Sequence, residues 1–159
     1  MKSEPQVVWR WAIGRWAMAS LVVACCGLVG CISPPSFTAG PTDSDAPTEF
    51  TQTASGLKYR ILRRADGEKP TASNTVTVHY EGWLDDKTEF DSSYRRGEPT
   101  TFALGQVVPG WTEGLQLVNK GGMIELEIPS QLGYGPKGMP GSIPPNATLH
   151  FKVELLDIR

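Results

Sequence analysis

Residues 75–81 read TVTVHYE, a strict alternation of polar and apolar side chains. Successive side chains of a β-strand point to opposite faces, so Val76, Val78 and Tyr80 share one face of a predicted strand. The same alternation recurs in LKYRI at 57–61, IELEI at 124–128 and LHFKVEL at 149–155. Strands that bury only one face are typical of an antiparallel sheet with one covered side and one solvated side.

One short amphipathic helix is predicted over residues 109–118, which read PGWTEGLQLV. Proline suits the first helical turn, and Trp111, Leu115 and Val118 recur on one helical face. The glycine pair at 121–122 ends the helix. The sequence therefore predicts an α+β domain, in which an antiparallel sheet curls around one helix and presents aromatic side chains to it.

The composition excludes several classes of protein. The formal net charge of −2 lacks the basic excess that nucleic-acid binding needs, so no nucleic-acid partner is expected. The two histidines, His79 and His150, lie on the polar faces of predicted strands, and we interpret both as satisfied surface residues. All three cysteines fall within 25–31, which leaves no thiol nucleophile in the rest of the chain. We therefore expect neither a metal nor a cofactor.

The first thirty residues resemble a bacterial lipoprotein signal peptide. Three basic residues precede an almost wholly apolar run at 16–32. Within it, LVGC at 28–31 resembles the lipobox, where the leader is cleaved before the cysteine and the thiol is acylated. We predict that residues 1–30 are removed before Cys31 and that Cys31 is lipidated. The alternatives are a weaker match at Cys25 and an uncleaved membrane anchor.

A lipidated N-terminus makes the membrane a partner, since two or three acyl chains anchor a protein essentially permanently. Ile32 carries no retention signal of the aspartate type, so the expected location is the cell envelope, on the outer membrane and facing the periplasm. Residues 31–51 are rich in Pro, Ser and Thr without an apolar period, which predicts a flexible tether. The folded domain is expected over 52–159.

Residues 133–138 match the G-x-G-x-x-G dinucleotide fingerprint. The fingerprint needs a helix directly after it, and MPGS at 139–142 cannot begin one, so we reject a nucleotide site. The surrounding stretch, 129–147, is dense in glycine and proline and too long for an ordinary connection. Because proline restricts the backbone, we expect a shaped lid here.

The domain offers no evident nucleophile, but it is rich in aromatic side chains: Tyr80, Trp83, Phe90, Phe102, Trp111, Tyr134 and Phe151. They are either core residues or the lining of an apolar pocket. Asp91, beside Phe90, is either a turn-capping residue or a polar member of that pocket.

Seven motifs occur in this order: VHYEG at 78–82, FDSS at 90–93, FALG at 102–105, VPGW at 108–111, GYG at 133–135, IPPNATL at 143–149 and FKVELL at 151–156. Together they closely resemble FKBP-type peptidyl-prolyl cis-trans isomerases, over essentially all of 52–159. The resemblance implies a five- to six-stranded antiparallel half-barrel sheet wrapped around one short helix, in agreement with the alternation pattern.

The resemblance also implies a proline-binding pocket. Its catalytic positions correspond to Tyr80, Phe90, Asp91, Tyr134 and Phe151, and its substrate-binding positions to Val107, Val108, Trp111 and Ile143. Trp111 would form the floor beneath the prolyl ring, with Tyr80, Phe90 and Phe151 as walls. The backbone N–H of Val108 would bind a substrate carbonyl.

The implied activity is the acceleration of X–Pro bond rotation in exported proteins, with proline-containing unfolded or flexible polypeptides as partners. Macrolides of the rapamycin type are a further ligand class that the family implies. Thr100, Met139 and Ser142 differ from residues frequent at the pocket rim, so the preference before proline and the macrolide affinity stay open. The alternative functions are a proline-binding or chaperone module of the envelope with little turnover, and an anchored structural domain without a ligand.

Overall fold

The structure is a computed structural model that describes residues 38–159. The predicted signal peptide, with Cys25 and Cys31, lies outside the described residues. Within 38–159, no helix is long and apolar enough to cross a membrane.

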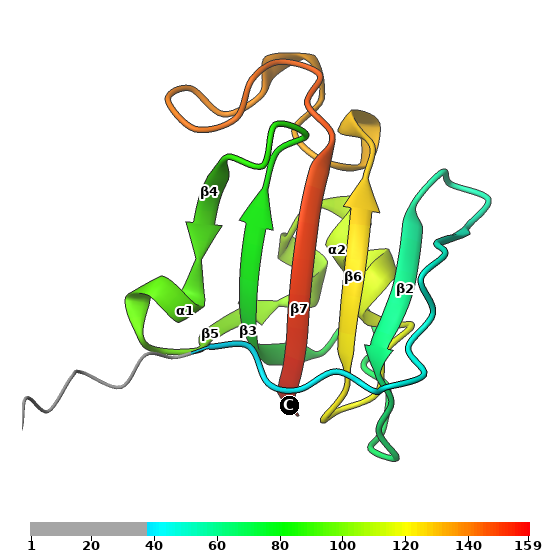
Figure 1. The fold of residues 1–159 in the computed structure, drawn as a ribbon. Helices are drawn as coiled ribbons and strands as arrows, with labels where there is room; N and C mark the ends of the chain where they lie inside the picture. The colour runs from blue at the N-terminus through cyan, green and yellow to red at the C-terminus, as the bar shows by residue number, and fades with distance from the viewer. Residues whose placement is uncertain (1–37) are drawn as a thin grey trace, which may run out of the picture. The chain divides into compact units, whose positions relative to one another are not determined.

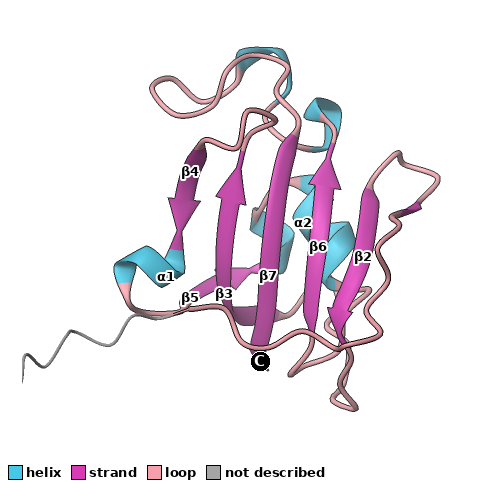
Figure 2. Ribbon diagram, in the orientation of Figure 1, coloured by secondary structure: helices cyan, strands magenta, loops and turns pink. Residues whose placement is uncertain are grey.

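The described residues form an antiparallel sheet with short helices (Figures 1 and 2). The strands are β1 (Thr51–Gln52), β2 (Lys58–Arg63), β3 (Thr75–Trp83), β4 (Glu89–Ser92), β5 (Thr100–Ala103), β6 (Met123–Ile128) and β7 (Leu149–Ile158). The α-helices are α1 (Ser93–Arg96) and α2 (Pro109–Leu115), and the 3-10 helices are η1 (Leu104–Gln106), η2 (Ser130–Leu132) and η3 (Gly135–Lys137).

The sheet order is β1-β2-β6-β7-β3-β4, and β5 also pairs with β3. This confirms the predicted α+β class and the four predicted strands, which become β2, β3, β6 and β7. Residues Val76, Val78 and Tyr80 are buried on the inner face, as the alternation predicts. The described part of the sheet has seven strands because it gains β1, β4 and β5, which have no more than four residues each.

Helix α2 packs against the inner face of the sheet through two glycines. A Cβ atom at Gly110 would lie 2.5 Å from Ile128 Cγ2, and one at Gly114 would lie 2.7 Å from Leu126 Cδ2. Only a glycine face allows this close approach of helix and strand. The helix ends at Leu115, three residues before the predicted end, where the Leu117 N–H bonds the Gly114 carbonyl in a tighter turn.

Residues 40–50, here called the N-terminal strap, depart from the prediction of a solvated tether. The Asp43 N–H bonds the Leu62 carbonyl at 2.8 Å, and the Asp43 carboxylate accepts from the Arg64 N–H at 2.8 Å. The Arg60 guanidinium donates to the Thr48 carbonyl at 2.7 Å. The strap therefore runs along the outer edge of β2 (Figure 1). Its acidic composition resembles a solvated linker, but arginines from β2 and the residue after it attract it to the sheet.

The loop between β6 and β7, residues 129–147, is folded on itself, in agreement with the expectation of a shaped segment. Met139 and Ile143 exchange two backbone hydrogen bonds of 2.9 and 2.8 Å, and the Asn146 N–H bonds the Gly135 carbonyl at 2.9 Å. At Gly138, a Cβ atom would lie 2.3 Å from the Ile143 carbonyl oxygen, and φ is +60°. The loop lies at one end of the sheet, and the strap crosses the opposite end (Figure 1).

Candidate active site

A cleft of about 530 Å³ opens between α2, the inner face of the sheet and the loop 129–147. We call it the aromatic cleft. Its lining residues are Tyr80, Phe90, Asp91, Phe102, Gln106, Val107, Val108, Trp111, Tyr134, Met139, Ser142 and Phe151. Every predicted site residue except Ile143 and Cys31 is in this set, so the structure brings together residues that are up to 71 positions apart (Tyr80 to Phe151).

Trp111 forms the floor of the aromatic cleft. Its indole is 4% exposed and meets three rings nearly edge-on: Tyr80 at 5.3 Å, Phe102 at 5.4 Å and Phe151 at 5.2 Å between centroids. Such perpendicular contacts are the favourable geometry for aromatic quadrupoles. Within the described residues, the indole N–H has no acceptor. The floor is thus a closely packed aromatic surface that lines the cleft on one side.

One wall of the aromatic cleft carries a polar cluster that we call the polar triangle: Tyr80, Asp91 and Arg96. The Tyr80 hydroxyl donates to one carboxylate oxygen of Asp91, and Arg96 donates to the other. Arg96 also donates to the Tyr80 hydroxyl oxygen at 2.9 Å. Burial, and then the bond to Asp91, raise the pKa of Tyr80 above its ordinary value, so the phenol stays protonated and donates to the carboxylate.

The mouth of the aromatic cleft is apolar. Tyr134 and Met139 are 40% and 36% exposed, which makes them the exposed large hydrophobic residues of the described chain. Ile143, predicted to bind substrate, is not among the residues that line the cleft. Its side chain is buried in the core, and its backbone pairs with that of Met139. Ile143 thus supports the rim from below.

Sequence reasoning missed three contributors to this site: Gln106, which lines the cleft, Phe102 and Arg96. Phe102 was among the aromatic residues but had no assigned role, because the four-residue strand β5 was not predicted; its register opposite Val76 places it on the inner face. Arg96 was missed because α1 is a single turn, capped by Ser92 and ended by Gly97 at φ +79°. The Ser-Ser pair at 92–93, with Gly97 four residues after it, is a local signal that could have indicated this turn.

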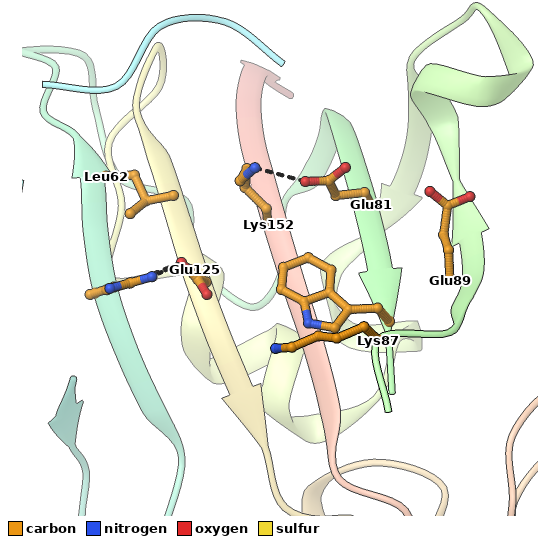
Figure 3. Close-up of a pocket in the computed structure, with 8 residues that line it drawn as sticks. Leu62, Glu81, Lys87, Glu89, Glu125 and Lys152 are labelled. Atoms are coloured by element: carbon orange, nitrogen blue, oxygen red, sulfur yellow. Dashed lines mark hydrogen bonds and ion pairs between the residues drawn. The ribbon is translucent and has the colours of Figure 1, made fainter. Parts of the chain in front are cut away.

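A second cleft of about 530 Å³, the outer-face cleft, lies on the solvated side of the sheet (Figure 3). It is lined by Arg60, Leu62, Glu81, Trp83, Lys87, Glu89, Glu125 and Lys152. The strand register sets Arg60 opposite Glu125, Glu125 opposite Lys152, and Lys152 opposite Glu81. The first and last of these pairs are ion pairs of 2.7 Å. These charges largely satisfy one another, so the outer-face cleft has little left to offer a ligand.

No group of three or more His, Cys, Asp or Glu side chains in residues 38–159 is arranged to hold a metal ion. The lining residues of the aromatic cleft can bind and orient an apolar group and exclude water from it, and the polar triangle adds its dipoles.

The family model described as "FKBP-type peptidyl-prolyl cis-trans isomerase" matches residues 66–156. The chain belongs to this family. Its FKBP-type domain is 55% identical over 106 residues to FkpA of Escherichia coli, a match that covers 67% of this chain and 39% of FkpA. It is 47% identical over 106 residues to Mip of Coxiella burnetii, covering 67% of this chain and 46% of Mip.

Solved structures agree with the fold of the FKBP-type domain. The crystal structure of FkpA from Escherichia coli matches with a TM-score of 0.69 and 50% identity, over 71% of this chain and 53% of that one. The crystal structure of AtFKBP13 matches with a TM-score of 0.65 and 32% identity, over 70% of this chain and 99% of that one. The chain spans less than half the length of the curated relatives FkpA and Mip.

Proposed function

We propose that this protein is a peptidyl-prolyl cis-trans isomerase that acts on proline-containing unfolded or flexible polypeptides. The observation that carries the proposal is the open aromatic cleft above Trp111, in a domain of the FKBP family. A prolyl ring is a compact apolar group, and a floor made of an indole with three perpendicular rings around it offers such a group contact on several sides.

The reaction needs no nucleophile, because no covalent bond breaks. Rotation about an X–Pro bond is opposed by about 18–20 kcal/mol of lost amide resonance and is slow without a catalyst. The planar amide is more dipolar than the twisted one, so an environment poor in water disfavours the planar ground state relative to the twisted state. Holding the prolyl ring fixed while the preceding residue rotates adds an orientational contribution. Lowering the barrier by about 5–6 kcal/mol gives about four powers of ten in rate.

The cleft residues divide this work among them. Trp111 supports the prolyl ring, and Tyr80, Phe90 and Phe151 enclose it; Phe90 and Phe151 already meet edge-on at 5.4 Å. Val107 and Val108 line the cleft just before α2, where the Val108 N–H binds a substrate carbonyl. The polar triangle faces the twisting amide, and the Tyr134 hydroxyl points into the mouth of the cleft, where a substrate can contact it.

A protease-coupled assay on short Leu-Pro and Phe-Pro peptides tests the proposal. The wild-type protein is expected to accelerate the cis-to-trans step, and Phe90→Ala and Asp91→Ala each to lower kcat/KM by about ten- to a hundredfold. Glu98→Ala, at an exposed position outside both clefts, is the control and is expected to match the wild type. Turnover that survives both cleft substitutions would remove the site assignment.

A second candidate function, binding or chaperoning without turnover, is favoured by one observation: the apolar mouth formed by Tyr134 and Met139. A mouth of this kind suits an apolar residue next to proline in an unfolded chain. A wild-type protein that binds a Phe-Pro peptide, prevents aggregation of an unfolded client and leaves the isomerisation rate unchanged would establish this function instead of catalysis.

We also propose that the protein acts in the cell envelope, anchored by lipid on Cys31 after removal of residues 1–30, on the outer membrane and facing the periplasm. The apolar leader ending in LVGC supports this. Mass spectrometry of the mature N-terminus tests it: the expected product begins at an acylated Cys31. Cys31→Ser is expected to abolish lipidation and Cys25→Ser to leave it intact. A mature chain that retains residue 1 would refute the cleavage.

A further inference from the structure

The edge of β3 that faces the polar triangle has a gap in its strand pairing. Glu81 pairs with Ser92 of β4, and Val78 pairs with Thr100 of β5. Between these two pairs, Tyr80 pairs with neither β4 nor β5, because the chain leaves β4 at Ser92 and turns into α1. Buried backbone N–H and C=O groups need partners, so something else must serve Tyr80 here.

A single side chain, Ser93, fills the gap. Its hydroxyl accepts from the Tyr80 N–H at 2.7 Å and donates to the Tyr80 carbonyl at 3.2 Å. It also lies 2.9 Å from His79 Nδ1. A hydroxyl has one proton and two lone pairs, so all three contacts are satisfied when His79 carries its proton on Nδ1. Ser93 is completely buried, which leaves these contacts no competition from water.

The His79 ring is held in the orientation that this contact requires. It stacks on Tyr94 of α1, with 4.7 Å between ring centroids and 14° between planes. The Tyr94 hydroxyl donates to Glu154 of β7 at 3.2 Å, and Glu154 is paired with Arg63. His79, Tyr94 and Ser93 thus join β3, β7 and the first turn of α1 on the outer side of the sheet.

The segment that Ser93 attaches to Tyr80 carries the other two members of the polar triangle. Asp91 is two residues before Ser93, and Arg96 is three residues after it, at the end of α1. The tyrosine whose backbone Ser93 clamps is also the one whose hydroxyl bonds Asp91 and whose ring contacts Trp111. We infer that Ser93, oriented by His79, is a positioning residue that fixes the polar triangle against the floor of the aromatic cleft. This rests on the proposed isomerase function.

Ser93→Ala tests the inference, because it removes the clamp without substituting any residue that lines the aromatic cleft. We expect kcat/KM to fall about tenfold or more, carried by kcat, since a misplaced group close to the reacting atoms costs rate. KM is expected to stay within about twofold of the wild type, because the binding surface of Trp111 and Phe151 is unchanged. Ser93→Thr, which keeps the hydroxyl, is expected to recover kcat.

Two further variants separate positioning from loss of stability. Met123→Ala is a destabilised control: Met123 is fully buried on β6 and is not a lining residue of the aromatic cleft, so its kcat is expected to match the wild type at a temperature where it is folded. His79→Phe retains a ring to stack on Tyr94 but lacks the nitrogen that contacts Ser93. Its kcat is expected to fall less than in Ser93→Ala but in the same direction, and it serves as the test if Ser93→Ala does not fold.

A spectroscopic arm does not depend on turnover. In ¹³C-tyrosine NMR, with the Tyr80 signal identified from Tyr80→Phe, the pKa of Tyr80 is expected to move from its raised value toward the ordinary one in Ser93→Ala, as the bond to Asp91 loosens. A folded Ser93→Ala with wild-type kcat and an unmoved Tyr80 titration would overturn the inference. A wild type without turnover would instead overturn the proposed function, and the Tyr80 titration would then decide the role of Ser93.

Discussion

The two sides of the sheet carry clefts of the same volume, about 530 Å³ each, with opposite chemistry. Adjacent residues of a strand contribute to opposite clefts. On β3, Tyr80 lines the aromatic cleft and Glu81 the outer-face cleft; on β7, Phe151 and Lys152 are divided in the same way. In the outer-face cleft, Arg60 is paired with Glu125 and Lys152 with Glu81, so these charges neutralise one another across the strands. In the aromatic cleft, the apolar ring surface of Trp111 lines the cavity, and its indole N–H is buried without an acceptor among the described residues.

Volume alone therefore does not make a binding site. A charged row that pairs with itself across four strands gains stability and solubility but has little binding capacity left. The aromatic rings around Trp111 of α2 line an open apolar cleft, which a substrate can fill. The alternation of side chains along β3 and β7 separates the two surfaces. A substitution on one face is therefore expected to leave the other face unaffected.

The largest effect is expected from a pair of adjacent substitutions on β7. Phe151→Ala removes a wall of the aromatic cleft that contacts both Trp111 and Phe90, and is expected to lower kcat/KM by about a hundredfold. Lys152→Ala changes the next side chain, on the opposite face, and is expected to leave kcat/KM within about twofold of the wild type. Equal losses from both, measured in the peptide assay, would contradict the division between the faces.

The next effect concerns the floor. Gly114→Ala places a methyl group against Leu126, which forces α2 away from β6, and is expected to destabilise the domain by about 1–3 kcal/mol. Urea unfolding measures this change. Glu113→Ala, on the less buried side of the same helix, is the control and is expected to change the free energy of unfolding by less than about 1 kcal/mol. If Gly114→Ala left the free energy of unfolding unchanged, the domain would tolerate a larger distance between α2 and β6.

A smaller effect is expected on the outer face. Glu125→Gln removes the partner of Arg60 in a partly exposed ion pair, and is expected to cost about 1 kcal/mol or less in urea unfolding. The loss is expected to shrink at high salt, since salt screens the wild-type pair. The rate of peptide isomerisation is expected to stay unchanged. A fall in kcat/KM comparable to that of Phe151→Ala would show that the outer face contributes to catalysis.

The smallest effect is a pH dependence at the strap. Burial raises the pKa of Glu154, but the Arg63 guanidinium outweighs it and holds this pKa below the ordinary value. A lowered pKa in the folded state contributes stability above about pH 4.5, which is lost as the pH falls through the folded-state value. Urea unfolding at pH 6 and pH 3.5 measures it, and Glu154→Gln is expected to show a weaker loss on acidification than the wild type.

The sequence predicts the long elements well because their patterns are local. The alternation over 75–81 and 149–155 requires only that one face be covered, and β3 and β7 confirm it. The short elements α1, β4 and β5 were missed because four residues carry too little pattern, and distant partners such as β3 stabilise them. The pocket residues were assigned from the family resemblance, and most of them line the aromatic cleft.

Two features of the site and the fold lay beyond any local pattern. The serines and the glycine around α1 could indicate a turn, but no local pattern shows that this turn brings Arg96 to Tyr80, which is 16 positions away. The strap has the composition of a linker and is held by arginines of β2 and of the residue after it. In both cases a charged side chain finds its partner through tertiary structure, which the sequence pattern alone does not show.

The strap also decides how the domain would bear a mechanical load. A pull on the chain ahead of Gly40 first reaches the 3.5 Å bond from its N–H to Glu154, and then the bond between Asp43 and Leu62. Both can peel away one at a time while the ladder of β3, β7 and β6 stays closed. A pull from the N-terminal side would thus release the strap before it deforms the sheet around Trp111.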